Sequence, residues 1–102
     1  MVTLKIKEND AQHALVMLNG ELDTAAIEKF KEDITPLTTE TGKELTLDFT
    51  ELEYISSAGM RILLVLNKQA QAQNASLTIT GMSEDIRQIF QMTGFDQMLD
   101  IK

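Results

Sequence analysis

Two serines stand between a strand-like stretch and a helix-like stretch, and they are the residues best suited to chemistry in this chain. The segment reads Ser56-Ser57-Ala58-Gly59 and is followed by an apolar run. The first N–H groups of a helix have no partner within the helix, and the helix dipole makes that end positive. A phosphate on a serine there would meet hydrogen-bond donors and a favourable field. The junction is therefore a candidate phosphorylation site, although a serine at this position is also typical of a helix N-cap.

Other catalytic arrangements find less support in the sequence. There is no G-x-S-x-G motif, and the single histidine, His13, lies beside the first expected hairpin turn, which disfavours a serine nucleophile. Asp23 and Asp48 are the carboxylates that we expect to approach one another, either as an acid–base pair or around a hard cation. Capping and loop-fixing hydrogen bonds are the favoured roles for both.

Motifs for cofactors and metals are also weak. The chain has no cysteine, which excludes a disulfide framework, a thiolate zinc site and a cysteine nucleophile. Thr41-Gly42-Lys43 resembles the tail of a phosphate-binding loop, but the earlier glycine is missing and no helix follows. We interpret these residues as a turn and expect no cofactor.

Composition narrows the class of protein further. A chain of 102 residues with 43% hydrophobic and 25% charged residues suits one globular domain, residues 1–102. The net charge of −7 disfavours nucleic acid and favours a basic protein partner. The first residues alternate in polarity rather than forming a signal peptide, and the longest apolar run, residues 62–66, is far shorter than the ~20 residues of a membrane span. We therefore expect a cytoplasmic protein without a membrane span.

The periodicity of apolar residues predicts an alternating α/β order. Strands are expected at residues 2–6, 14–18, 45–50 and 77–80, with 98–101 as a last strand or short helix. Helices are expected from an Asp23 cap to Leu37, from Ser56–Ser57 to Asn74, and from Ser83 or Glu84 to Thr93. The first two strands form a hairpin, and strands separated by helices form a parallel part of the sheet. The serine loop should then lie at the carboxyl end of a parallel strand, where functional loops gather.

Three segments carry a resemblance to a known family: Gly20–Asp23, Leu47–Met60 and Ile89–Phe95. The chain resembles a STAS domain of the anti-sigma factor antagonist family over nearly its whole length. The resemblance implies a single α/β domain, with a mixed sheet of four or five strands and helices mainly on one face. It also implies a regulatory protein rather than an enzyme. Such an antagonist binds an anti-sigma factor that is often a serine kinase, is released by phosphorylation of a serine at the start of the second major helix, and is restored by a serine phosphatase.

The chain departs from the usual form of the family's motif, Asp-Ser-Ser-Gly or Asp-Ser-Thr-Gly. Aligned on Gly59, Ser56 replaces the aspartate, Ser57 stands at the first serine, and Ala58 removes the second hydroxyl. The expected acceptor is Ser57, with Ser56 or no phosphorylation as alternatives. The partner surface is expected to contain the following residues: Asp23, Ser56, Ser57, Ala58, Gly59, Met60 and Arg61.

Three functions follow, in order of preference. The first is a phosphorylation-controlled module that binds an anti-sigma factor. The second is a STAS adaptor or scaffold that is not phosphorylated, for example an accessory subunit of a lipid-transport ATPase, and the small residues Ala58 and Gly59 favour close docking of this kind. The third is an enzyme that uses Asp23 and Asp48.

Overall fold

The structure is a computed structural model that describes residues 1–38 and 41–102. Its sheet has five strands in the order β1-β2-β3-β4-β5. The strands are β1 (Val2–Asn9), β2 (His13–Leu22), β3 (Glu44–Ile55), β4 (Ser76–Thr80) and β5 (Asp100–Ile101). Only β1 and β2 pair antiparallel, and the other described pairs are parallel. The predicted α/β class with a mixed sheet is confirmed, and residues 100–101 form its fifth strand.

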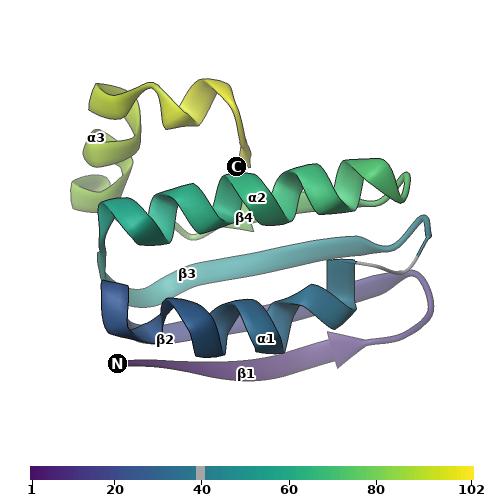
Figure 1. Cartoon of the computed structure of the whole chain (residues 1–102). Helices are drawn as coiled ribbons and strands as arrows, with labels where there is room; N and C mark the ends of the chain where they lie inside the picture. Colours follow the sequence, from purple (N-terminus) through teal and green to yellow (C-terminus); the bar gives the residue numbers. More distant parts are fainter. Residues whose placement is uncertain (39–40) are drawn as a thin grey trace.

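Within the described residues, three helices and two short 3₁₀ turns connect the strands. The helices are α1 (Ile27–Thr38), α2 (Ser57–Ala72) and α3 (Glu84–Thr93), and the 3₁₀ turns are η1 (Thr24–Ala26) and η2 (Phe95–Gln97). Figure 1 shows α1 and α2 side by side on one face of the sheet, with α3 at the end where α2 begins. The helices thus cover mainly one face, as predicted.

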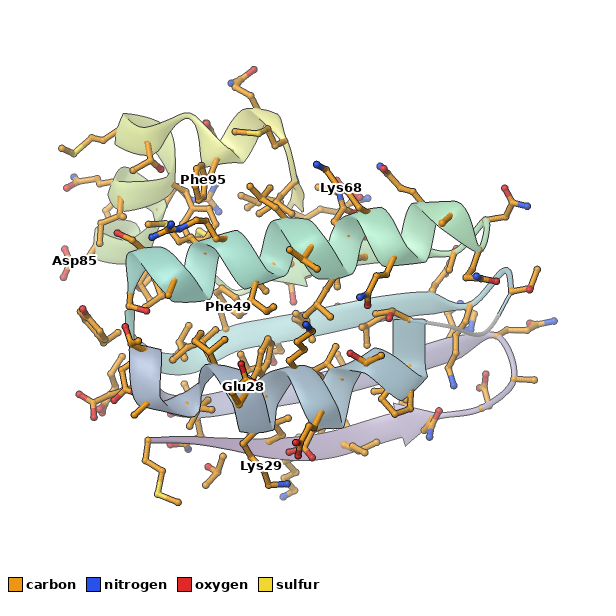
Figure 2. The ribbon with its side chains drawn as sticks, viewed as in Figure 1. Glu28, Lys29, Phe49, Lys68, Asp85 and Phe95 are labelled. Carbon is orange, nitrogen blue, oxygen red and sulfur yellow. The ribbon has the colours of Figure 1, made fainter. Side chains whose placement is uncertain are left out.

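The core lies between that face of the sheet and the two long helices. Alternate residues of a strand point to the same face, so the apolar positions of β2 and β3 gather on the side of the helices. Phe49 of β3 lies in the layer between β3 and α2 (Figure 2), and it is fully buried. The helices contribute residues at helical spacing, namely Phe30 and Ile34 of α1 and Leu63 and Leu66 of α2.

Two central strands run further than the polarity pattern indicates. We expected β2 to end before Asn19–Gly20 and β3 to end near Thr50, but they continue to Leu22 and Ile55. Leu22 pairs with Ile55 in the parallel register. The pairing between the strands therefore overrides the local turn signal of Asn19–Gly20, and it brings the loops after β2 and β3 to the same edge of the sheet.

The junction between β3 and α2 as a candidate functional site

Ser56 caps α2 and is held in place by two hydrogen bonds. Its backbone is extended, with φ −84° and ψ 168°, and its Oγ accepts a hydrogen bond of 3.0 Å from the Gly59 N–H. Its own N–H donates to the Leu22 carbonyl at 3.0 Å. Only 9% of the residue is exposed. The Ser56 hydroxyl is therefore occupied by the cap and turned away from solvent.

Ser57 has the opposite environment. It is the first residue of α2 and is exposed, and no hydrogen bond within the described part of the chain engages its hydroxyl. One turn further on, the exposed Arg61 places its Nε 3.5 Å from the Ser57 carbonyl oxygen. A macromolecule or a modifying enzyme can therefore reach the Ser57 hydroxyl, with a cationic side chain close by.

Gly59 and Met60 lie beneath this surface. A Cβ added to Gly59 would lie 2.8 Å from the Leu22 carbonyl oxygen and 2.9 Å from Ile55 Cγ1, so the first turn of α2 packs directly on the ends of β2 and β3. The Met60 side chain is 3% exposed. Gly59 and Met60 were both expected on the partner surface, but Gly59 is buried and the Met60 side chain points into the core. Ala58 is half-buried beside Ser57.

Asp23 lies at the same edge of the sheet as the serines. It directly follows Leu22, just as Ser56 follows Ile55, and those two residues are paired. Its Oδ1 accepts a 3.0 Å hydrogen bond from the Ala26 N–H and thereby caps η1. The expected capping role is confirmed, and the partly exposed carboxylate borders the serine junction.

The expected approach of Asp23 and Asp48 is wrong. Asp48 pairs with Met17, whereas Ile55, beside Leu22, lies seven residues further along β3. At about 3.3 Å per residue, this places the two carboxylates roughly 20 Å apart along the strand. The Asp48 Oδ1 instead accepts hydrogen bonds from the N–H and the hydroxyl of Thr50. The extension of β3 beyond Thr50 is the reason that the sequence-based expectation fails.

His13 lies far from the serines as well. It begins β2, and its Nε2 is 2.8 Å from a carboxylate oxygen of Glu44. Leu22, at the other end of β2, is the residue that contacts the serine junction. The imidazole therefore cannot act as a base for Ser57 in this fold.

Sequence reasoning missed the surface formed by the extension of β3. Glu51, Glu53 and Tyr54 are all exposed, and the Tyr54 residue retains 48% of its accessible surface. Tyr54 pairs with Glu21 of β2, whose side chain is 54% exposed. The signal was present in the charged residues on either side of Leu52, but only the register shows that they extend the sheet toward Ser57.

Neither a metal cluster nor a membrane-spanning helix is found in the part of the chain that the structure describes. In residues 1–38 and 41–102, no group of three or more His, Cys, Asp or Glu side chains is arranged to hold a metal ion. No helix in these same ranges has the length and apolar character needed to cross a membrane. The arrangement at the junction is one that presents a surface and a single free hydroxyl.

The fold and the junction define the class of protein. The family model for the STAS domain matches residues 3–102, and the chain belongs to this family. The anti-sigma-B factor antagonist of Bacillus subtilis is 30% identical over 100 residues, covering 98% of this chain and 88% of that protein. The protein of the same name from Listeria monocytogenes is 28% identical over 101 residues, covering 99% of this chain and 89% of that protein.

Solved structures show the same fold. The unphosphorylated form of the anti-sigma factor antagonist SpoIIAA is similar with a TM-score of 0.80 and 19% identity, covering 98% of this chain and 88% of that one. The phosphorylated form of SpoIIAA, described as a Bacillus cell fate determinant, has a TM-score of 0.73 and 19% identity, covering 98% and 91%. This likeness extends over the whole described sheet and its helices.

Proposed function

We propose that this protein is an anti-sigma factor antagonist that binds an anti-sigma factor through the junction between β3 and α2. The observation that carries the proposal is the contrast between a buried, capping Ser56 and an exposed Ser57 with a free hydroxyl. Relatives that bear this functional name match almost the whole chain, and this supports the same role here. On this proposal the protein acts by binding in the cytoplasm rather than by catalysis.

Phosphorylation at Ser57 is the proposed control. A kinase needs a reachable hydroxyl, and the Ser56 hydroxyl is buried and already accepts the Gly59 hydrogen bond. A phosphoserine carries about −1.5 to −2 charges at pH 7 together with bulky hydrated oxygens. Ser57 and Ala58 are small, so a partner can pack closely on them, and a phosphate would fill that space and resist desolvation. A serine kinase and a serine phosphatase are the proposed modifying enzymes.

Mass spectrometry after incubation with the cognate kinase and ATP tests the acceptor. We expect one phosphate on the wild type and on Ser56→Ala, and none on Ser57→Ala. A phosphate retained by Ser57→Ala would overturn the assignment.

Measuring affinity for the anti-sigma factor tests whether phosphorylation of Ser57 regulates binding. Titration calorimetry with the cognate anti-sigma factor should show at least about ten-fold weaker binding for Ser57→Asp, or about 1.4 kcal/mol. Ser57→Asn is the matched neutral control of nearly equal shape and should bind as the wild type does. Equal affinities of the two variants would argue for an adaptor that is not phosphorylated, a role that the small Ala58 beside Ser57 also permits.

A further inference from the structure

One stretch of β3 has a strand neighbour on one side only. Thr80, the last residue of β4, pairs with Asp48. On the other side, β2 continues to pair with β3 as far as Leu22 and Ile55. In the described residues, the second half of β3 therefore forms a free edge of the sheet, and this edge leads directly into Ser56 and α2 (Figure 1).

The position of Gly81 defines where the free edge begins. A Cβ on Gly81 would lie 2.3 Å from the Thr50 Oγ1, and the Thr50 N–H is bonded to the Asp48 Oδ1. The chain that leaves β4 thus closes the edge as far as Thr50. Beyond it lies the edge Glu51–Ile55, which is irregular at one point, because the register with β2 shifts between Leu52 and Tyr54 and leaves Glu53 as an extra residue. On the side away from β2, these residues have no backbone hydrogen-bond partner among the described residues.

The side chains along this edge are acidic and aromatic. Glu51 and Glu53 are exposed, and neither forms an ion pair in the described part of the chain. Tyr54 presents a half-exposed ring, the kind of side chain that is enriched at binding hot spots. Leu52 and Ile55 are buried and hold the strand in place. The edge therefore combines negative charge with backbone that lacks a strand neighbour on one side.

The opposite edge of the sheet has the reverse character. Lys5 and Lys7 of β1 are exposed, and the register with β2 shifts between Ile6 and Glu8. These lysines give the β1 edge a charge opposite to that of Glu51 and Glu53. A second copy would offer this bulged strand to the β3 edge, and such a head-to-tail contact would generate open chains of molecules. A strand from a different protein can pair with the β3 edge without forming such chains, so it is the better match.

We propose that the edge Glu51–Ile55 accepts an extended segment of a partner protein as an added β-strand, and that lysine or arginine side chains of the segment face Glu51 and Glu53. Main-chain hydrogen bonds provide the contact along the edge, and alternate side chains provide its specificity. The inference rests on the proposed function, since the edge would belong to the same docking surface as Ser57. It adds the chemistry of the partner: a basic, strand-forming segment beside the phosphorylated position.

The probe for this edge is a capped peptide of alternating lysine and valine, Lys-Val-Lys-Val-Lys-Val-Lys, titrated into the ¹⁵N-labelled protein. We expect amide shift changes and slower amide exchange concentrated between Glu51 and Ile55. The fully N-methylated peptide has no N–H donors and should not bind. A peptide with glutamate in place of lysine should leave these amides unchanged.

Charge reversal provides the matched variants. Glu51→Lys combined with Glu53→Lys should weaken binding of the lysine–valine peptide by about ten-fold, because two attractions become repulsions. Glu28→Lys combined with Glu32→Lys makes the same change in charge at exposed positions of α1. Its affinity for the peptide should stay within about two-fold of that of the wild type. Equal weakening by both pairs, undiminished binding of the N-methylated peptide, or shifts that avoid residues 51–55 would overturn the proposal.

The Ser57→Asp variant separates this inference from the proposed function. Its edge is intact, so it should bind the lysine–valine peptide within about two-fold of the wild type, even where it no longer binds the anti-sigma factor. If the protein does not bind the peptide but is phosphorylated normally on Ser57, only the proposal of strand pairing at the edge is overturned. If the protein binds the peptide normally but carries no phosphate on Ser57, only the proposed phosphorylation is overturned.

Discussion

Removing the Ser56 hydroxyl gives the sharpest test of how the two serines divide their roles. In Ser56→Ala the Gly59 N–H loses its 3.0 Å acceptor at a site that is closed to solvent. Replacing an N-cap serine by alanine costs about 0.5–2 kcal/mol, and leaving a buried donor without a partner costs about 1–3 kcal/mol. Because Gly59 is buried, we expect the upper part of the first range, about 1–2 kcal/mol.

That loss is large enough to measure in a domain of this size. About 1 kcal/mol shifts the melting temperature by roughly 4–8 °C in domains of 60–100 residues, so Ser56→Ala should melt at least about 4 °C below the wild type. Urea denaturation should show a lower midpoint with an unchanged slope, since the folded and unfolded surfaces stay the same.

Ser57→Ala is the matched control for this prediction. The same atom is removed one residue away, from an exposed hydroxyl that takes part in no cap, so its stability should stay within about 0.5 kcal/mol of the wild type. Each variant should therefore be affected in a different assay: Ser56→Ala loses stability, and Ser57→Ala loses phosphorylation. If both melt alike, or if Ser57→Ala is the less stable, the division of roles inferred from the cap is refuted.

Two further predictions concern packing and pH. Gly59→Ala should lower the melting temperature, because the added Cβ would lie 2.8 Å from the Leu22 carbonyl oxygen. This crowding costs about 1–3 kcal/mol, which exceeds the ~1 kcal/mol by which alanine favours a helix over glycine. An unchanged or higher melting temperature would contradict this close contact. At the hairpin, hydrogen bonds from the N–H groups of Gln12 and His13 hold the pKa of Asp10 below its ordinary value. The stabilisation that they provide is present above the ordinary pKa and is lost as pH falls through the lowered value. Carboxyl NMR should therefore show Asp10 titrating below an unfolded reference, and Asp10→Asn should flatten the stability profile in acid.

Much of the fold can be predicted from local pattern. The alternation at Leu45, Leu47 and Phe49 identifies a strand with one buried face, and the spacing of Phe30 and Ile34 identifies a helix with one buried stripe. These patterns are reliable because period two and period 3.6 each follow from the backbone geometry of one element. The lengths of β2 and β3 could not be predicted, because the pairing of Leu22 with Ile55 outweighs the turn tendency of Asn19–Gly20.

The amino-acid sequence is enough to identify the family, the order of strands and helices, and the two serines at the start of a helix. Three-dimensional packing determines which serine is buried, because the Leu22 carbonyl and the Gly59 N–H that hold Ser56 come from different elements. It also separated Asp23 from Asp48 and left the acidic edge of β3 open, since both depend on the register of strands far apart in the chain. Exposure is a property of contacts between distant residues, and no local pattern of residue types contains it.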